Sequence, residues 1–95
     1  MPSTRISNWH YVYILLSEKD NEFYVGYTRD LNRRIQEHNA KRNFSTKPRT
    51  PLRLIYAEAC LNEEDAKRRE DYLKTTQGRR FLKLRIRKYL LNKSG

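Results

Sequence analysis

The residues of this chain that could carry out chemistry are tyrosines, an arginine, a histidine and a carboxylate. Two tyrosine-bearing tripeptides, Tyr11-Val12-Tyr13 and Tyr24-Val25-Gly26, lie in a stretch whose composition predicts a β-hairpin. A predicted helix carrying Arg34 and His38 follows, and a later helix carries Glu70. Phenol, guanidinium and a lone carboxylate are sufficient for metal-assisted cleavage of a phosphodiester. These residue types therefore point to hydrolysis of nucleic acid, provided that the fold brings them together.

Glu70 is the least expected of these residues, because it belongs to the apolar stripe of its helix. Ala66 stands four residues before it and Leu73 three residues after it, on the same helical face. An ionised carboxylate on such a stripe is costly unless it is paired or binds a metal. The helical geometry leaves two interpretations open, an ion pair with a nearby arginine and a role as a ligand or catalytic group.

Arg34 and His38 are four residues apart and share one face of their helix, next to its apolar stripe. Taken singly, an arginine at such a place is ordinary solvated surface, and a lone histidine is more often a packing residue than a reactant. Tyr13 and Tyr24 occupy predicted strands, where aromatic residues are common. Each residue alone is a weak signal, and the combination carries the functional hypothesis.

The elements that must position these residues follow in the order strand, strand, helix, strand, helix, helix. Strands are predicted over residues 9–16, from residue 23 to Gly26, which ends the second strand, and over residues 52–59. Helices are predicted from Thr28 or Asp30 to about residue 41, from Asn62 to about residue 75, and, after a break at Gly78, over residues 79–91. The sequence predicts an α+β domain of order ββαβαα over residues 9–92, preceded by a flexible tail over residues 1–8.

Charge indicates the class of partner. The formal net charge is +10, from 21 Lys and Arg residues against 11 Asp and Glu residues. Residues 41–53 and 79–93 each contain several basic residues and no acid. Such patches favour a polyanion, most simply nucleic acid, over an anionic membrane or a solvated surface without a partner. The residues expected to follow a nucleic-acid backbone are Lys47, Arg49, Lys74, Arg79 and Arg80.

Length and composition exclude several other classes. Ninety-five residues support one domain with a single modest core. The only cysteine, Cys60, excludes an intrachain disulfide and a multi-cysteine zinc site. The N-terminus lacks the apolar core of a signal peptide, and no apolar run approaches membrane-spanning length. We expect a cytoplasmic protein without a membrane partner or a small-molecule cofactor.

The ordered series of motifs resembles the GIY-YIG nuclease family over about residues 9–90. It is most like a small stand-alone member, related to the N-terminal nuclease domain of excision-repair endonucleases. The two triplets correspond to the signature triplets, with Tyr11 in place of the name-giving glycine. Residues 28–39, 45–56 and 66–74 correspond to the family's helix motif, its basic loop with the third strand, and its acidic helix. Tyr27 departs from excision-repair relatives, which carry a lysine after the second triplet.

The resemblance implies a three-stranded antiparallel sheet flanked by helices, and cleavage of nucleic acid with one divalent metal ion. Tyr13 and Tyr24 match the two signature tyrosines, and Arg34 matches the family's catalytic arginine. His38 matches a position that is tyrosine or histidine in relatives, and Glu70 matches the metal-binding glutamate. A single carboxylate suits Mg²⁺ or Mn²⁺, which keep several waters and take further ligands from a substrate phosphate.

We therefore expect a metal-dependent endonuclease acting on DNA more than on RNA, with Tyr13 or Tyr24 as the general base. The alternatives are a non-catalytic nucleic-acid-binding module and an accessory of a DNA repair complex. The joint presence of the phenols, Arg34 and Glu70 favours the enzyme, because binding alone requires neither Glu70 nor the phenols.

Overall fold

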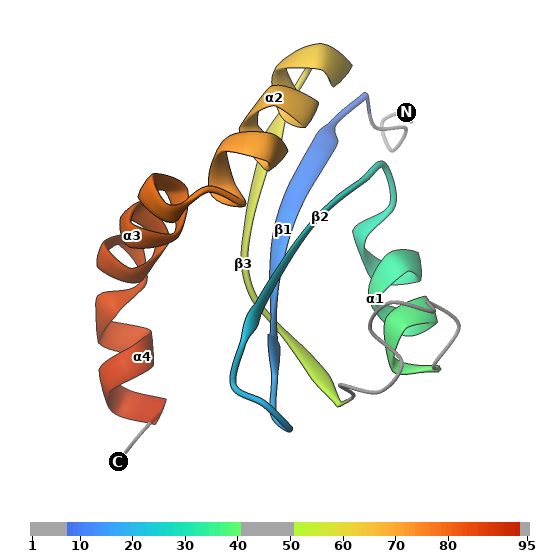
Figure 1. Cartoon of the computed structure of the whole chain (residues 1–95). Helices are drawn as coiled ribbons and strands as arrows, with labels where there is room; N and C mark the ends of the chain where they lie inside the picture. The colour runs from blue at the N-terminus through green and yellow to red at the C-terminus, as the bar shows by residue number, and fades with distance from the viewer. Residues whose placement is uncertain (1–7, 41–50, 94–95) are drawn as a thin grey trace.

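The computed structural model of the chain describes residues 8–40 and 51–93, which form a three-stranded antiparallel sheet and four helices. The strands are β1 (His10–Ser17), β2 (Phe23–Thr28) and β3 (Leu52–Cys60). The helices are α1 (Leu31–Asn39), α2 (Glu63–Leu73), α3 (Thr76–Arg85) and α4 (Arg87–Lys93) (Figure 1). The predicted α+β class and antiparallel sheet are confirmed, and the element order is ββαβααα.

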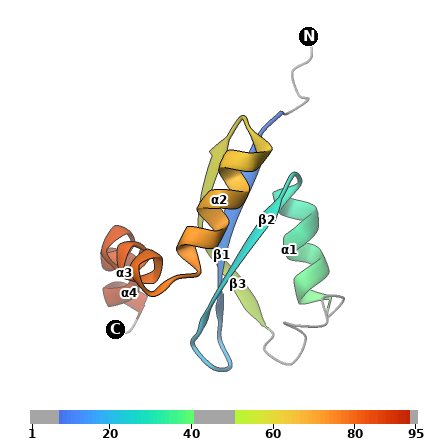
Figure 2. The same cartoon turned by 45° about the horizontal axis from the view of Figure 1, so that its top comes forward.

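The strand order β2-β1-β3 places β1 in the centre of the sheet, where its side chains fill two separate cores. Because side chains alternate along a strand, successive residues of β1 face opposite helices. Figures 1 and 2 show α1 on one side of the sheet and α2 with α3 on the other. The buried residues of the α2 side are Val12, Ile14, Leu16, Phe23, Ala66, Leu73 and Leu82. The buried residues of the α1 side are Tyr13, Leu15 and Leu52, with Leu31 and Ile35 of α1 packed against them.

The hairpin predicted from the turn residues joins β1 to β2. Ser17 donates its backbone N–H to Glu22 across the turn, at 3.0 Å, and accepts from the backbone N–H of Asn21 at 2.9 Å. Asn21 has φ 61°, a left-handed conformation that asparagine adopts more readily than most residues. The turn sets the register in which Tyr13 of β1 faces Gly26 of β2.

The helical region after β3 differs from the prediction. Gly78 does not break the chain but lies buried within α3, whose N-cap is Thr75. A Cβ atom at Gly78 would overlap the backbone of Tyr72 and Leu73, so the glycine allows α3 to pack directly against the end of α2. The predicted last helix is two helices, because Ile86 leaves helical geometry with φ −111° and ψ 29°.

Two further findings concern the predicted tail and the predicted absence of a membrane span. The predicted tail over residues 1–8 lies outside the described residues except for Asn8. None of the helices in the described ranges is long and apolar enough to cross a membrane.

A charged network fixes α2 on the sheet. Arg69 of α2 donates from both Nε and Nη2 to the carboxylate of Glu58 on β3, each at 2.9 Å. The same carboxylate accepts from the hydroxyl of Tyr56 at 2.9 Å, and the Arg69 guanidinium lies 4.7 Å from the ring centre of Phe81 on α3. A bidentate pair of this kind sets orientation as well as distance. Glu70 follows Arg69 in the chain, so the network also determines where Glu70 stands.

We predict that Glu58→Gln lowers the free energy of unfolding by about 1–3 kcal/mol, because it removes a charged partner from half-buried Arg69. Glu18→Gln, which breaks an exposed ion pair with Arg53, is the matched control and should cost less than about 1 kcal/mol. Urea denaturation of both variants measures the difference. Equal costs would contradict a structural role for the Glu58 network.

The same pair should show a defined pH dependence. Burial raises the pKa of Glu58, but hydrogen bonds from Arg69 and Tyr56 outweigh it, so the folded-state pKa is lowered. The stabilisation is therefore complete above the unfolded pKa of about 4.3 and is lost as the pH falls through the folded pKa. We expect the difference between wild type and Glu58→Gln to shrink on acidification below about pH 4.3. Denaturation midpoints measured across that range test the sign.

Candidate active site

The hydroxyl of Tyr13 is the centre of the candidate site. Tyr13 is 3% exposed on the central strand. Arg34 of α1 donates from Nε to the phenol oxygen at 3.4 Å, and Nε2 of His38 lies 3.1 Å from that oxygen. The rings of Tyr13 and His38 meet edge to face, with centroids 6.0 Å apart. Three residues predicted from the sequence are thus in direct contact, although more than twenty positions separate Tyr13 from Arg34 in the chain.

Gly26 makes room for this arrangement. It faces Tyr13 across the β1–β2 ladder, and a Cβ atom at Gly26 would overlap Cζ and the hydroxyl oxygen of the Tyr13 ring. The ring therefore lies over Gly26, from the central strand toward the edge strand. The prediction that Gly26 ends β2 is wrong, because the strand continues to Thr28. The glycine is required for close approach and not for an unusual φ, since no glycine in the described residues has positive φ.

Burial and charge act on the Tyr13 phenol in opposite directions. Burial raises its pKa, and the hydrogen bond and positive charge of Arg34 lower it. The net pKa is raised, so Tyr13 is a neutral phenol at neutral pH. The hydrogen bond to Tyr13 raises the pKa of Arg34, which remains a cation. The phenol oxygen consequently accepts from Arg34 while its own proton is available to another acceptor.

His38 is that acceptor. It is 4% exposed, and burial followed by the positive charge of Arg34 lowers its pKa. The imidazole is therefore neutral at neutral pH, with one nitrogen able to accept. In the tautomer with its proton on Nδ1, His38 accepts from Tyr13 at Nε2, while Tyr13 accepts from Arg34. The result is a directed chain of hydrogen bonds, from Arg34 to Tyr13 to His38.

Glu70 approaches this chain from α2, on the opposite side of the sheet. Its side chain is 19% exposed, and its Oε2 pairs with Lys74 at 3.3 Å. The paired cation is Lys74, the C-cap residue of α2 one turn further along the chain, and not the arginine considered from the sequence. The negative charge of Glu70 contributes to the raised pKa of Tyr13, so the two groups are within electrostatic reach of each other.

The surroundings of Glu70 fit a hydrated divalent ion better than a protein cage. Among the described residues, its Oε1 has no hydrogen-bond partner. No group of three or more metal-ligating side chains occurs in residues 8–40 and 51–93. A half-buried carboxylate with one open oxygen suits Mg²⁺ or Mn²⁺, which bind through one or two carboxylates and retain waters.

Tyr24 shares the sheet face of Tyr13 but its hydroxyl has a different partner. It faces Leu15 in the ladder, and it packs against the core cluster under α1. Its hydroxyl donates to Oδ2 of Asp20 in the hairpin turn, at 3.0 Å. Tyr13 is the tyrosine that directly contacts Arg34 and His38.

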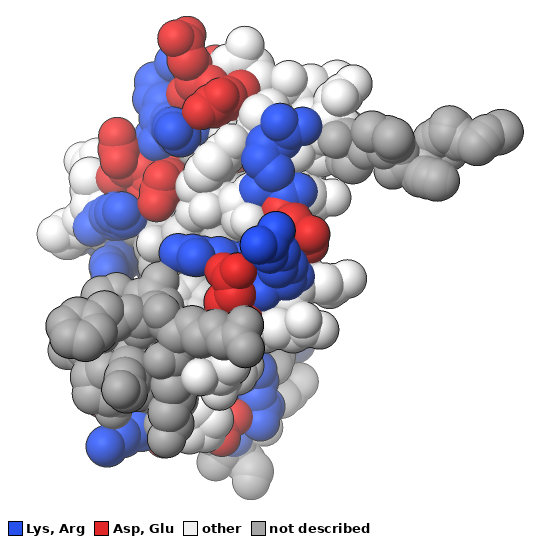
Figure 3. Space-filling model, turned by 90° about the vertical axis from the view of Figure 1, so that its right-hand side faces the viewer, with Lys and Arg blue, Asp and Glu red and all other residues white. Residues whose placement is uncertain are grey.

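A surface pocket opens beside this site. It has a volume of about 380 Å³ and is lined by Tyr27, Thr28, Arg29, Asp30, Arg33, Arg34 and Glu37. Figure 3 views the molecule from the α1 side, where Lys and Arg side chains gather in groups with acidic side chains among them. Glu37 pairs with both Arg33 and Arg34, at 3.3 and 3.0 Å. The pocket therefore presents two arginines, Arg33 and Arg34, that are already paired with Glu37.

Sequence reasoning missed a second group of side chains at the rim. The hydroxyl of Tyr27 is 2.8 Å from Nδ1 of His10, and the two rings stack. The ammonium of Lys67 on α2 lies 5.2 Å from the centre of the Tyr27 ring. The sequence marks Tyr27 only as a departure from relatives. The pairing of His10 with Tyr27 depends on strand register, which single residues do not reveal.

The five residues predicted to contact nucleic acid do not form one group in the structure. Lys47 and Arg49 lie outside the described residues. Lys74 is half exposed beside Glu70. Arg79 donates to the backbone carbonyl of Phe23 at 3.3 Å, and Arg80 is exposed on α3. Figures 1 and 2 place α3 on the side of the sheet away from α1, so these two arginines lie apart from the pocket.

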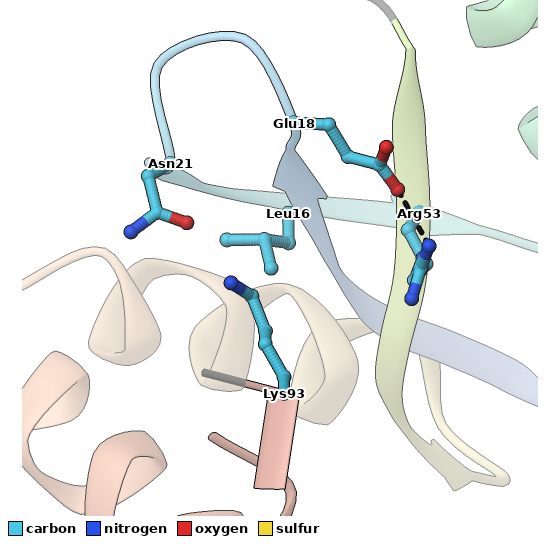
Figure 4. A pocket seen from close by; sticks show the side chains of 5 residues that line it. All are labelled: Leu16, Glu18, Asn21, Arg53 and Lys93. Atoms are coloured by element: carbon cyan, nitrogen blue, oxygen red, sulfur yellow. Dashed lines mark ion pairs between the residues drawn. The ribbon is translucent and has the colours of Figure 1, made fainter. Parts of the chain in front are cut away.

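A second pocket lacks comparable chemistry. It has a volume of about 310 Å³ at the turn of the hairpin and is lined by Leu16, Glu18, Asn21, Arg53 and Lys93. Figure 4 shows the Glu18–Arg53 ion pair on one side and the Lys93 side chain extending toward Leu16. It holds no tyrosine or histidine, and the site at Tyr13 is therefore the better candidate.

Comparisons with known proteins agree with the geometry. Residues 9–83 match the family model described as the GIY-YIG catalytic domain. A UPF0213 protein of Staphylococcus haemolyticus is 42% identical over 76 residues, which cover 79% of this chain and 92% of that protein. The UPF0213 protein YazA of Bacillus subtilis is 39% identical over 69 residues, covering 72% of this chain and 69% of that protein.

A solved structure is also similar. The solution NMR structure of a UPF0213 protein from Bacillus halodurans is 38% identical in sequence. The match covers 78% of this chain and 81% of that chain, with a TM-score of 0.49.

We predict that Gly26→Ala lowers the free energy of unfolding by about 1–3 kcal/mol, because the new methyl group displaces the Tyr13 ring. In a Tyr13→Leu background, which removes the overlapping atoms, the same change should cost at least about 1 kcal/mol less. A double-mutant cycle measured by urea denaturation gives the coupling. Independent, additive costs would refute the overlap between ring and glycine.

We also predict that the pKa of His38, followed by NMR, lies below about 6.5 and rises in Arg34→Met, because removal of the guanidinium charge favours imidazolium. Arg33→Met removes an exposed arginine of the same helix and should leave the His38 pKa unchanged. A lower His38 pKa in Arg34→Met would contradict the assigned electrostatics.

Proposed function

Because the chain belongs to the GIY-YIG family, we propose that it is a metal-dependent endonuclease that hydrolyses phosphodiester bonds in nucleic acid, DNA rather than RNA. The observation that carries the proposal is the Tyr13 hydroxyl, which contacts both Arg34 and His38 and responds to the charge of Glu70. Hydrolysis needs a proton acceptor for water, relief of negative charge on the phosphoryl oxygens, and assistance to the leaving oxygen. Each requirement has a candidate group within this cluster.

Arg34 is proposed to bind the scissile phosphate. Its Nε donates to the Tyr13 hydroxyl and its Nη1 donates to Glu37, while Nη2 has no partner among the described residues. A guanidinium held at two points and open at the third can donate to a phosphoryl oxygen with little loss of side-chain entropy. Because Arg34 is already fixed, it can stabilise charge that builds on the phosphate without reorganising.

Tyr13 and His38 are proposed to move the proton. A phenol that donates to neutral His38 can pass its proton to Nε2 as it accepts a proton from the attacking water. This transfer avoids a free phenolate, which the raised pKa of Tyr13 disfavours. Tyr24 is the alternative general base. Its hydroxyl would have to break its hydrogen bond to Asp20 before it could accept a proton from water.

Glu70 is proposed to hold one divalent ion, Mg²⁺ or Mn²⁺, through Oε1. When bound, such an ion supplies positive charge to a phosphate oxygen and to the leaving oxygen. Lys74 would orient Glu70 through the contact at 3.3 Å. The half-buried position of Glu70 excludes bulk water from part of the site, which strengthens each charge interaction there.

Binding of the nucleic-acid backbone is assigned to the basic residues predicted from the sequence. Lys74, with Lys47, Arg49, Arg79 and Arg80, remains the proposed set for phosphate contacts. Such contacts position a strand without reading its bases, so the proposed enzyme would have weak sequence specificity. The competing function, a binding module or repair accessory without catalysis, would use the same cations but not the Arg34–Tyr13–His38 chain.

We predict that Glu70→Gln lowers the rate of cleavage at least about a hundredfold, because the neutral amide cannot hold the ion. Glu64→Gln, an exposed carboxylate in the first turn of α2, is the matched control and should retain the wild-type rate. Labelled single-stranded, duplex and branched DNA with Mg²⁺ or Mn²⁺ are the substrates, and a chelator should stop cleavage. Equal activity of Glu70→Gln would assign any cleavage to contamination or to another site, and wild-type inactivity on all substrates would favour the binding module.

We further predict that Tyr13→Phe lowers the cleavage rate by about 10² to 10⁴, because it removes the transferable proton but keeps the packed ring. Tyr24→Phe is the discriminating partner, and on the proposed assignment it loses less than Tyr13→Phe. Rates of both variants, measured with His38→Ala across pH, identify the tyrosine. A larger loss in Tyr24→Phe would transfer the role of base to Tyr24.

A further inference from the structure

Part of the α1 face of the sheet is not covered by α1. The helix packs over the half of the face that contains Leu15 and Leu52, through its residues Leu31 and Ile35. Beyond Tyr13, toward the start of β1 and the end of β3, the face has exposed apolar residues. Trp9 is 43% exposed and Leu61 is 65% exposed, which is unusual for large apolar side chains next to a strand.

The register defines the composition of this area, which we call the aromatic face: Trp9, Tyr11, Ala57, Ala59 and Leu61. Tyr11 faces Ala59 across the β1–β3 ladder, and Tyr13 faces Ala57. Both alanines are exposed and Tyr11 is half-buried. Small residues beside aromatic ones leave space over the sheet into which a flat group can enter.

The aromatic face is continuous with the candidate active site. Tyr11 and Tyr13 are two positions apart on β1 and point to the same side of the sheet. They are therefore separated by roughly 6.6 Å along the strand, on the order of one nucleotide of an extended chain. A strand whose phosphate lies at Arg34 could extend along β1 with its bases against Tyr11 and Trp9.

The distribution of charge favours a polyanion over a second copy of the chain as the partner of the aromatic face. The aromatic face has no charged side chain among its five residues, while Arg29, Arg33 and Arg34 stand at the neighbouring pocket. A polyanion that carries flat apolar groups complements both surfaces. A second copy of the chain fits poorly, since each copy has a net charge of +10 and like charges repel.

We propose that the aromatic face stacks unpaired nucleobases next to the scissile phosphate, so that the substrate of the site is single-stranded or locally unpaired nucleic acid. This inference rests on the proposed nuclease function, whose substrate class it specifies. Aromatic residues on an open sheet surface stack bases that are free of a duplex, and a paired base cannot present its face to them.

Trp9 provides a direct measurement, because it is the single tryptophan of the chain. An oligothymidylate of about 12 nucleotides, added without divalent ions so that nothing is cut, should quench its emission. An abasic oligonucleotide of equal length has the same phosphates and no bases. It should bind through charge alone and leave the emission unchanged, and equal quenching by both would overturn the proposal.

Tyr11→Ala tests the contribution of one stacking residue. It should weaken binding of the oligothymidylate by about five- to 150-fold and leave binding of the abasic strand unchanged. Tyr72→Ala, a substitution at a tyrosine on α2 that is 38% exposed and outside the aromatic face, is the matched control and should bind like wild type. Circular dichroism of both variants checks folding, and the abasic comparison tests the proposal even if Tyr11→Ala does not fold.

Cleavage separates this proposal from the proposed function. The wild-type chain with Mn²⁺ should cut a single strand at least about fivefold faster than the duplex of the same sequence. If the single strand and the duplex are cut equally fast and quenching does not depend on bases, the proposed base stacking on the aromatic face is wrong, but the nuclease function stands. If quenching depends on bases but no substrate is cut, the nuclease function is wrong, but base stacking on the aromatic face stands. A dimer that dissociates on Tyr11→Ala would assign the face to a second copy instead.

Discussion

The contact between the Tyr13 ring and Gly26 is the constraint on which the site depends. Helices α1 and α2 lie on opposite sides of the sheet, so side chains from both can meet only around an edge. Tyr13 starts from the central strand, and its ring reaches toward the edge because Gly26 has no side chain. Any larger residue at that position would hold the hydroxyl away from β2. The close approach to the short edge strand is thus what brings the hydroxyl of a central-strand residue toward the sheet edge.

The electrostatics follow from where that hydroxyl is placed. A phenol buried to 3% exposure loses its hydration, and an unpaired hydroxyl there would be costly. Arg34 and His38 satisfy it from α1, one by donating and the other by accepting. Burial simultaneously lowers the pKa of His38, and this keeps the acceptor neutral. The interactions that stabilise the buried phenol are therefore the same ones that would prepare the proposed proton transfer.

Much of this arrangement is predictable from the sequence, and the rest depends on tertiary contacts. Alternating apolar residues predict the strands, turn residues predict the hairpin, and Tyr13, Arg34 and His38 do meet. The prediction that Gly26 and Gly78 end elements is wrong at both positions, because a glycine needed for close packing has the same local signal as a breaker. The His10–Tyr27 pair and the clamp of Arg69 on Glu58 join distant segments, so no spacing in the chain reveals them.

On the proposed function, the hydrogen-bonded pair of Arg69 and Glu58 explains how a single carboxylate could hold the metal ion. A metal ligand that acts without other protein ligands must be oriented by its own helix, because no neighbouring ligand corrects its position. The hydrogen bonds from Arg69 to Glu58 and the burial of Ala66 and Leu73 hold α2 on the sheet. The position of Glu70 on that helix is therefore fixed by its neighbours. The charge of Glu70 contributes to the raised pKa of the phenol to which Arg34 donates, so, on the proposed function, Glu70 and Arg34 would serve the same phosphate. Because Mg²⁺ and Mn²⁺ take further ligands from substrate phosphates, metal affinity and substrate affinity would then rise together.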